Sequence, residues 1–483
     1  MRLGTCSVIS VCILLSAIVV VRPAQGQTPC GGAAGPDVIV GIITGPSNYT
    51  ATGTAPNNWE ALSLGTTSCN MGTATLKWDA CPANTHPVIG GTLFRYSTVS
   101  GAGRFEQVGQ SWLKHGFLAL ADSDCCTCQN PGTGSRLGIG CSDPYSASRN
   151  GSQSGLGPKY TVNAHTGAYP ASCPTHPSGG NNGRIEVRIS DLIATTGGPA
   201  ATTRYFGQAQ YVTPDDASSN NQNNNCSYIE ATVSGSASAW TFGFLGSTVR
   251  QFPAVNMWKA IDPIVVQSNL DAPEDNGLPG RVILCGRATS LGGGQYHYEY
   301  ALYNMNSDRS IQSFSIPVSP YATITNVGFR DVDYRGGDGG GGVNYDGTDW
   351  SATIAGGSIG WATQTYATNT NANALRWGTM YCFRFDANLA NAVSDGIATM
   401  VQFKPGATTF TGATPVPAVV TCTRGDVNGD GVINGGDISM FSQILVSGSG
   451  TPTQKCAMDA DANFSVDSSD IEPFGTCLLN SGC

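Results

Sequence analysis

The chain has 483 residues, of which 40% are hydrophobic and only 12% charged, and its formal net charge is −9. This hydrophobic content excludes intrinsic disorder, and the length allows two to four domains. An acidic chain without basic clusters also excludes nucleic acid and anionic membrane as partners. The 63 glycines, together with abundant Ser, Thr and Asn, are typical of an extracellular, turn-rich β-protein.

The N-terminus has the pattern of an export signal. An apolar run from Val8 to Val21 follows a basic start and precedes Ala24-Gln-Gly26, a small-x-small cleavage pattern. The run is shorter than the ~20 residues that a membrane span needs. We therefore predict that residues 1–26 are a Sec-type signal peptide cleaved near Gly26. The mature chain would have no membrane span and would be secreted or held at the cell surface.

The cysteines agree with export, because disulfides persist in oxidising compartments. Of 17 cysteines, two lie in the predicted signal and four near the C-terminus, which leaves eleven (17 − 2 − 4). An odd number predicts at least one unpaired thiol or an intermolecular bridge. The group Cys125, Cys126, Cys128 and Cys141 could hold zinc, but disulfides are favoured in an exported chain. The four C-terminal cysteines allow three pairings, and all three stay open.

Short strands separated by turns are predicted through most of the chain. Residues 27–228 are expected to form a β-rich, Cys-rich module, in which Asp37–Ile43 is a buried strand. From Ile229 onward, apolar and polar residues alternate more regularly, which predicts a β-sandwich-like module over residues 229–405. The Gly336–Gly342 segment is expected to be a loop. A Thr-, Pro- and Ala-rich linker is predicted over residues 406–422. The predicted fold class is therefore mainly β, followed by a small helical domain over residues 423–483.

That last prediction comes from a repeated pattern of oxygen-bearing side chains. Asp426 opens a twelve-residue loop with the residue order of an EF-hand, including Gly431 at its sixth position. Asp459 opens a second such loop 33 residues later (459 − 426). Hard cations such as calcium take six to eight oxygen ligands. Apolar residues spaced by three and four follow each loop, so each half should form a short helix that packs on the other.

This stretch, from Thr423 to about Asn480, resembles the type I dockerin domain, which attaches secreted bacterial proteins to cohesin modules through calcium. The resemblance implies two Ca²⁺ sites and a cohesin-like partner. One ion would be held by Asp426, Asn428, Asp430, Asn434, Asp437 and the Val432 carbonyl. The other would be held by Asp459, Asp461, Asn463, Asp467, Asp470 and the Ser465 carbonyl.

The chain departs from the dockerin pattern in two ways. Phe464 stands where glycine is expected, so the second loop should be strained or bent differently and should bind calcium more weakly. At the loop positions that contact cohesin in the family, the second repeat has Ser468-Ser469 but the first has Gly435-Gly436. The resemblance therefore implies calcium binding more strongly than docking to a familiar cohesin.

The sequence contains no catalytic signature, and two chemistries stay open. Glycoside hydrolysis needs two carboxylates about 5 to 10 Å apart, and Glu106 and Asp143 are the weak candidates. The alternative is that these carboxylates are solvated or pair with arginine. Copper or zinc could bind His86, His115 and His165, although their spacing matches no short metal motif. His115 is thus the third weak catalytic candidate.

Phrases such as Trp112–Gly116 and Cys141–Tyr145 resemble secreted bacterial proteins of unknown function, many with the same C-terminal module. The dockerin resemblance implies that the β-rich part binds or breaks down extracellular polysaccharide. We therefore expect a secreted protein that displays a polysaccharide-associated module through a calcium-binding domain. The alternative is a glycoside hydrolase that hydrolyses O-glycosyl bonds. A second alternative is a copper-dependent oxidoreductase or a purely structural cell-surface protein.

Overall fold

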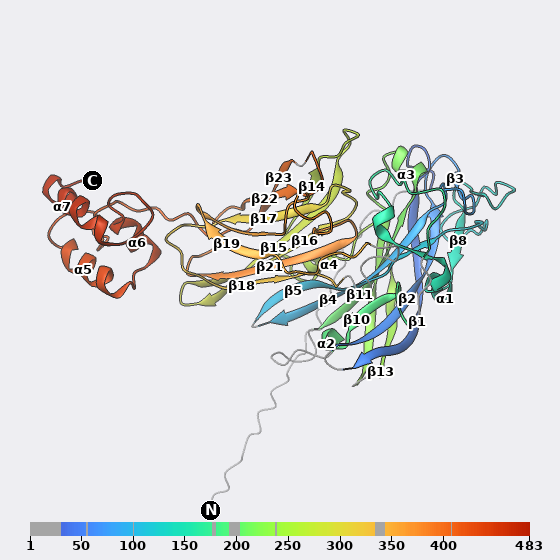
Figure 1. Ribbon diagram of the computed structural model, residues 1–483, viewed down its shortest axis with the longest axis horizontal. Coiled ribbons are helices and arrows are strands. Elements are labelled where there is room, and N and C mark those ends of the chain that lie inside the picture. The colour runs from blue at the N-terminus through green and yellow to red at the C-terminus, as the bar shows by residue number, and fades with distance from the viewer. Residues whose placement is uncertain are drawn as a thin grey trace, which may run out of the picture.

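The computed structural model describes residues 30–483 apart from residues 55–56, 100, 176–179, 193–202, 237–238, 334–342 and 407. The predicted signal peptide and the Gly336–Gly342 loop lie outside the described residues. Two β-rich units and a small helical C-terminal unit follow one another along the long axis of the molecule (Figure 1). The prediction of a mainly β chain with a helical C-terminal domain is confirmed.

The first β-unit is built on one antiparallel sheet with strand order β1-β2-β10-β5-β4-β11-β12-β13. Its edges meet, because the Asn48 side chain exchanges two hydrogen bonds with the backbone of Phe242 (3.1 and 2.8 Å). The sheet therefore closes around its own apolar core. Its strands are β1 Val38–Thr54, β2 Asn57–Asn70, β3 Leu76–Lys77, β4 Val88–Val99, β5 Ala102–Gln110, β6 Leu113–His115, β7 Arg136–Leu137, β8 Ser142–Tyr145, β9 Leu156–Gly157, β10 Ile185–Arg188, β11 Arg204–Val212, β12 Cys226–Ser236 and β13 Ala239–Val249. Its short helices are α1 Ala147–Asn150, α2 Ile189–Leu192 and α3 Pro214–Ser218.

The predicted boundary between residues 228 and 229 is wrong. It falls inside β12, which pairs with β11 on one side and β13 on the other. The first unit therefore continues to Val249, because removing β12 and β13 would open the sheet.

The second β-unit is a sandwich, as predicted. It has two five-stranded sheets, with orders β14-β15-β16-β21-β18 and β19-β20-β17-β22-β23. Aromatic rings fill the space between them, and Phe314 and Phe383 stack with centroids 4.5 Å apart. A short helix, α4 Asn256–Ile261, precedes strands β14 Val266–Ala272, β15 Gly280–Gly292, β16 Gln295–Asn304, β17 Ile311–Pro317, β18 Ile324–Arg330, β19 Ser351–Ala355, β20 Ser358–Ala362, β21 Thr379–Ala387, β22 Gly396–Gln402 and β23 Thr409–Thr414.

The predicted linker over residues 406–422 is wrong in its first half. β23 lies within it and pairs with β22 along the edge of the sandwich. Only the residues after Thr414 are left to connect the sandwich to the C-terminal unit.

The two β-units share an apolar core of their own. Phe94, Phe105 and Phe206 project from β4, β5 and β11 and pack with Tyr303, Met380 and other residues of the sandwich. Strand β11 shows why the sequence permits this: Tyr205, Ala209 and Tyr211 face the core of the first unit, while Phe206 faces the sandwich. Successive side chains of a strand point to opposite faces, so one strand can contribute to two cores.

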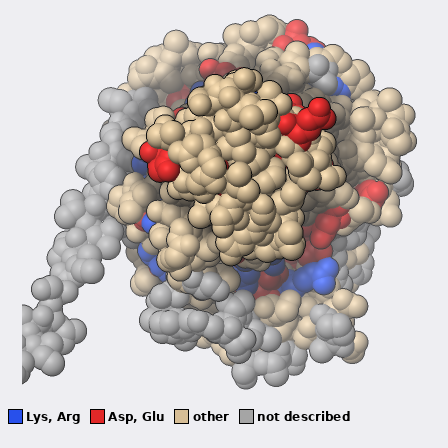
Figure 2. Space-filling model, turned by 90° about the vertical axis from the view of Figure 1, so that its left-hand side faces the viewer, with Lys and Arg blue, Asp and Glu red and all other residues tan. Residues whose placement is uncertain are grey.

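The C-terminal unit consists of helices α5 Asp437–Ser447, α6 Pro452–Met458 and α7 Ile471–Asn480. The rings of Phe441 and Phe474, which occupy equivalent places in the two repeats, stack with centroids 3.9 Å apart. Disulfides Cys422–Cys456 and Cys477–Cys483 close the unit. Few charged side chains appear on the end of the molecule that this unit forms (Figure 2).

The cysteines of the β-units form four disulfides, Cys30–Cys126, Cys69–Cys125, Cys81–Cys173 and Cys128–Cys141. The Cys125 to Cys141 group is therefore bridged, as favoured for an exported chain. Within the described part of the chain, Cys226, Cys285 and Cys382 are unpaired and buried. No helix among the described residues is long and apolar enough to span a membrane.

Candidate functional site

The first of the two repeated loops is closed by the carboxylate at its end. Asp437 Oδ1 accepts hydrogen bonds from the backbone N–H groups of Val427 (2.8 Å) and Asn428 (3.0 Å), and Oδ2 accepts one from Asn434 (3.0 Å). Asp426 accepts three further backbone N–H groups, from Gly429, Asp430 and Gly431. These bonds fold the loop around its carboxylates. The oxygen atoms gathered in this way are the ligands that a hard cation prefers.

The second loop repeats this arrangement. Asp470 accepts the N–H groups of Ala460 (2.8 Å) and Asp467 (3.0 Å), in the same way as Asp437 in the first loop. Oxygens of Asp459, Asp461 and Asp470 lie within 4.8 Å of one another, which fits a shared cation. Three carboxylates this close repel one another, and a divalent cation would neutralise them.

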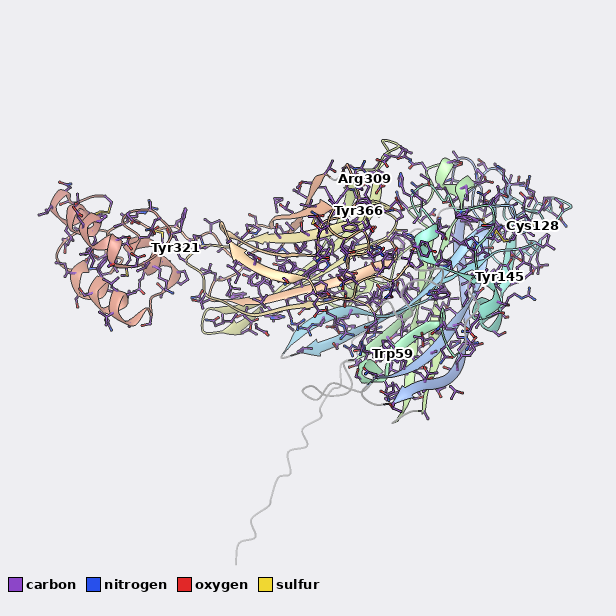
Figure 3. The ribbon with its side chains drawn as sticks, viewed as in Figure 1. Trp59, Cys128, Tyr145, Arg309, Tyr321 and Tyr366 are labelled. Carbon is purple, nitrogen blue, oxygen red and sulfur yellow. A yellow bond between two sulfur atoms is a disulfide. The ribbon has the colours of Figure 1, made fainter. Side chains whose placement is uncertain are left out.

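Phe464 adopts the backbone conformation of the glycine it replaces. Its φ is 69°, compared with 86° for Gly431 at the same position of the first loop. The second loop therefore keeps the expected shape and does not bend differently, although its φ strains a residue that has a Cβ. The Phe464 side chain is 62% exposed and approaches Tyr321 of the sandwich, with centroids 6.4 Å apart. Tyr321 lies where the sandwich meets the C-terminal unit (Figure 3).

Comparison with known families decides what this unit is. Residues 424–473 match the model of the dockerin type I domain. The C-terminal unit is a type I dockerin. Dockerin domains bind calcium and attach to cohesin modules, which supports calcium binding and a cohesin-like partner for this chain.

Other comparisons add little for the β-units that precede the dockerin. No curated protein matches the chain. Among solved structures, the chain is similar to a GH20 exo-β-N-acetylglucosaminidase from Vibrio harveyi in complex with N-acetylglucosamine, with 12% identity and a TM-score of 0.18. The similarity covers 29% of this chain and 18% of that chain. At this level it indicates neither the fold nor the activity of the β-units.

Glu106 is an ion-paired residue at the interface of the two β-units. It is 2% exposed, and its carboxylate contacts Arg95 Nη2 at 2.7 Å and Arg330 Nε, from β18 of the sandwich, at 3.4 Å. Burial alone would raise the pKa of Glu106, but the charges of Arg330, Arg95 and Arg104 outweigh it and hold the pKa below its ordinary value. The structure therefore shows the Glu106 carboxylate paired with arginine and not solvated.

Asp143 lies in a different cluster, on β8. It is 1% exposed, and its Oδ1 accepts the Leu120 N–H at 2.9 Å. Burial raises its pKa to about 6. Among the described residues, no hydrogen bond or ion pair is shared between Asp143 and Glu106. Trp112 and Tyr145, aromatic residues whose rings could stack on a sugar, are also buried. Both carboxylates are buried and held by protein contacts, which argues against an open, aromatic-lined cleft between them.

Two of the three candidate histidines converge. His86 Nε2 lies 3.0 Å from His115 Nδ1, in a buried position between the loops that carry Cys81 and Cys173. Burial lowers the pKa of His86, and burial together with His86 and Lys114 lowers that of His115 to about 4, so both rings are neutral at pH 7. His165 is separate, because its Nε2 contacts Asn276 at 2.9 Å.

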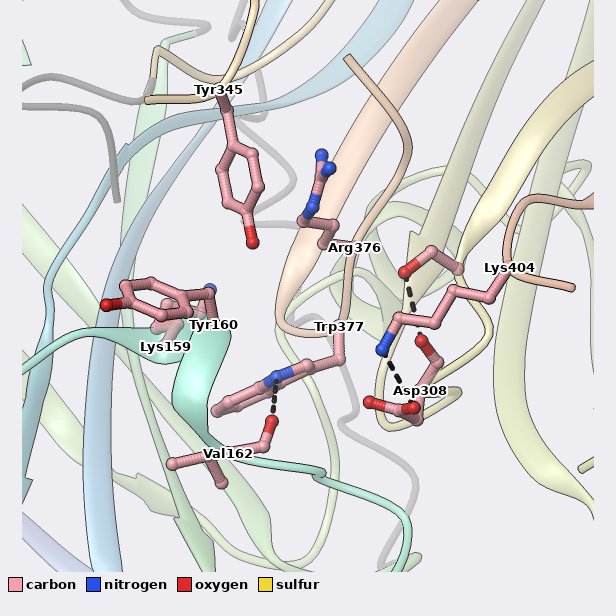
Figure 4. A pocket seen from close by; sticks show the side chains of 9 residues that line it. Lys159, Tyr160, Val162, Asp308, Tyr345, Arg376, Trp377 and Lys404 are labelled. Atoms are coloured by element: carbon pink, nitrogen blue, oxygen red, sulfur yellow. Dashed lines mark hydrogen bonds and ion pairs between the residues drawn. The ribbon is translucent and has the colours of Figure 1, made fainter. Parts of the chain in front are cut away.

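A pocket that the sequence did not indicate lies between the two β-units. Its cavity volume is about 40 Å³, and both units contribute aromatic and cationic side chains (Figure 4). It is lined by Lys159, Tyr160, Val162, Asp308, Ser310, Tyr345, Arg376, Trp377 and Lys404. No sequence signal could have found it, since residues more than 200 positions apart meet there only after folding.

The pocket's side chains are held by specific contacts. Trp377 Nε1 donates to the Val162 carbonyl at 3.0 Å and so joins the two units at the pocket floor. The Lys159 ammonium lies 4.9 Å from the Trp377 ring centroid, and the Arg376 guanidinium lies 3.4 Å from that of Tyr345. Lys404 pairs with Asp308 at 2.8 Å. Three cations against one carboxylate leave the pocket positively charged.

Proposed function

We propose that this chain is a non-catalytic, polysaccharide-binding component of an extracellular complex, attached to a cohesin module through its dockerin. The observation that carries the proposal is the dockerin itself, whose two loops are already folded around their carboxylates. The predicted signal peptide supports export, and the disulfides are consistent with it.

The dockerin binds two calcium ions in this proposal. The first is held by Asp426, Asn428, Asp430, Asn434, Asp437 and the Val432 carbonyl. The second is held by Asp459, Asp461, Asn463, Asp467, Asp470 and the Ser465 carbonyl. The second site is the weaker one, because Phe464 strains its loop.

Exposed apolar residues beside both loops support a protein partner for the dockerin. Ile438 and Ile471 start the helices that follow the loops, and they are 48% and 52% exposed. Exposed aliphatic side chains on a surface with little charge are typical of a protein-binding face. Gly435-Gly436 and Ser468-Ser469 lie just before these helices, so the two repeats would present different faces to a cohesin.

The pocket between the β-units supports polysaccharide binding. Aromatic rings stack on the faces of sugars, and the cations around Trp377 suit carboxylate or sulfate groups. We therefore propose an acidic polysaccharide as the ligand class. The burial of Glu106 and Asp143, and the arginine pairing of Glu106, favour binding over hydrolysis.

Cohesin attachment is tested by pull-down of the full chain with a panel of immobilised type I cohesin modules, in calcium and in EGTA. We expect calcium-dependent capture by at least one cohesin. A double variant, Asp437→Asn with Asp470→Asn, should not be captured, whereas Asp122→Asn in the first β-unit should behave as the unaltered chain. Calcium-dependent folding without any capture would contradict a cohesin partner of this type.

Polysaccharide binding is tested with neutral and acidic polysaccharides, with reducing-sugar release assayed in the same tubes. We expect retention on an acidic polysaccharide that is lost in Arg376→Ala and Lys404→Ala but kept in Lys77→Ala, a lysine outside the pocket. Sugar release by the unaltered chain would show a glycoside hydrolase instead. Equal retention of all variants would place the binding site elsewhere.

A further inference from the structure

Two cysteines and two histidines from three separate segments meet in the first β-unit. Cys81 lies in the loop after β3, His86 lies just before β4, His115 ends β6, and Cys173 lies in the loop before β10. One ligand atom from each lies within 4.8 Å of the other three. This side-chain set, two sulfurs and two imidazole nitrogens, is the one that tetrahedral zinc sites use.

The hydrogen bonding of His86 aims a lone pair at the centre of the cluster. Its Nδ1 lies 2.7 Å from the Asp79 carbonyl, which can only accept, so Nδ1 carries the proton. Nε2 is therefore unprotonated in the neutral ring, and it faces His115 Nδ1 at 3.0 Å and both cysteine sulfurs at 3.8 Å. Metal-bound histidines are oriented in the same way, by donating their other N–H to a carbonyl or carboxylate.

These distances match the edges of a zinc tetrahedron. With Zn–S of about 2.3 Å and Zn–N of about 2.0 Å, sulfur and nitrogen ligands lie about 3.5 Å apart and two nitrogens about 3.3 Å apart. The S···N separations of 3.8 Å and the N···N separation of 3.0 Å are each within a few tenths of an ångström of these values. The two sulfurs are much closer than in a metal site, because they are joined as the Cys81–Cys173 disulfide.

Most of this cluster is enclosed by the protein. His86, His115 and Cys173 are buried, and the Tyr169 ring covers both imidazoles with centroids 5.4 Å from each. The Tyr169 hydroxyl donates to the His86 carbonyl at 2.5 Å, which holds the ring in place. Cys81 is exposed and gives the sulfur pair its access to solvent. Four protein ligands and no open position are typical of a structural zinc site.

We propose that Cys81, His86, His115 and Cys173 form a redox-gated zinc site, in which the disulfide excludes zinc and the reduced pair binds it. A dithiol reductant transfers two electrons and two protons to the Cys81–Cys173 bond, giving two thiols and an oxidised dithiol. Zn²⁺ then binds both sulfurs with loss of the two thiol protons, while His86 Nε2 and His115 Nδ1 supply the other two ligands. For this, the His115 proton moves to Nε2.

The experiment opens the site without reducing the other disulfides. Cys81→Ser cannot form the bridge, and it leaves the Cys173 thiol beside two imidazoles in an otherwise oxidised chain. The variant is dialysed against Zn²⁺ with excess Ca²⁺ to occupy the dockerin, and zinc is measured by mass spectrometry. We expect about one zinc ion per chain, compared with less than about a tenth for the unaltered oxidised chain. Substitution with Co²⁺ should give the visible bands of a tetrahedral thiolate complex.

Two controls separate this site from incidental binding. Cys128→Ser also breaks a disulfide and frees a thiol, that of Cys141. No histidine in the described part of the chain is grouped with that pair, so this variant should bind no zinc. Adding His86→Gln to Cys81→Ser should abolish binding, while circular dichroism checks that the fold persists.

The outcomes are decisive in both directions. A folded Cys81→Ser chain without zinc, or equal zinc in the His86→Gln double variant, would overturn the proposal. If Cys81→Ser fails to fold, the unaltered chain is reduced with a limiting amount of dithiol instead. Zinc should then protect Cys81 and Cys173 from alkylation, and failure to protect them would equally overturn it.

Discussion

The Tyr321 hydroxyl donates a hydrogen bond of 2.5 Å to Asp459 Oδ2 (Figure 3). Tyr321 belongs to the sandwich, between β17 and β18, and Asp459 opens the second repeated loop of the dockerin. Burial and then the Asp459 carboxylate raise the pKa of Tyr321 to about 12, so the hydroxyl keeps its proton at neutral pH. One carboxylate thus belongs both to the second repeated loop and to the contact between two domains.

Tyr321→Phe should loosen the dockerin from the sandwich. A hydrogen bond to a charged group contributes about 1.5 to 3 kcal/mol, and here it joins domains that are linked by a short segment. We expect a larger radius of gyration in small-angle X-ray scattering and faster proteolysis after Thr414. Tyr366→Phe, which removes a hydroxyl elsewhere in the sandwich, is the control. Identical scattering for all three proteins would show that the contact is dispensable.

Asp437→Asn should remove the first calcium site and leave the second. The two carboxylate oxygens of Asp437 accept hydrogen bonds from three backbone N–H groups. In asparagine an NH2 group replaces one of these oxygens, so a donor would face a donor. The loss of one charge-assisted ligand should weaken that site by about 10- to 100-fold, so it stays empty at calcium concentrations that just fill the unaltered site. Isothermal titration should then find one ion bound, and Asp470→Asn should show the reciprocal loss. Two ions bound in either variant would contradict the assignment of its loop.

Phe464→Gly should bind calcium more tightly at the second site than Phe464→Ala. Both variants lose the ring that approaches Tyr321, but only glycine adopts a φ of 69° without strain. The left-handed conformation costs a residue with a Cβ about 1 kcal/mol, which corresponds to about a fivefold difference in affinity. Calcium titration of the two variants measures the difference. Equal affinities would mean that the loop carries no strain when calcium is bound.

Asp143→Asn should alter the pH dependence of stability. The pKa of Asp143 is about 6 in the folded chain, compared with an ordinary value of 3.8. Between these two pH values, Asp143 is therefore protonated in the folded chain and ionised in the unfolded chain. Its contribution to stability is therefore present below pH 4, falls as pH rises and is lost above about pH 6. Relative to the unaltered chain, the variant should gain about 3 kcal/mol between pH 4 and pH 7. Urea unfolding at both pH values provides the measurement, and a pH-independent difference would refute the shift.

Prediction from sequence succeeded where a pattern is local. The dockerin loops and their helices are complete within about 50 residues, and Phe441 and Phe474 pack as the repeat predicts. The sandwich was predicted from alternating strands such as Gln295–Asn304. The predicted boundary at residue 229 failed because β12 pairs with β11 and β13, and pairing is not visible in the pattern of a single strand.

The sequence by itself determined that the chain is mainly β and that it ends in a calcium-binding dockerin, because periodicity and ligand spacing act over short stretches. Only the tertiary structure decided what the isolated polar residues do. It placed Glu106 against Arg330, 224 positions away (330 − 106), and joined His86 and His115 with Cys81 and Cys173. It also built the pocket from both β-units. The physical reason is that such groups are brought together by strand pairing and core packing, which depend on the whole chain.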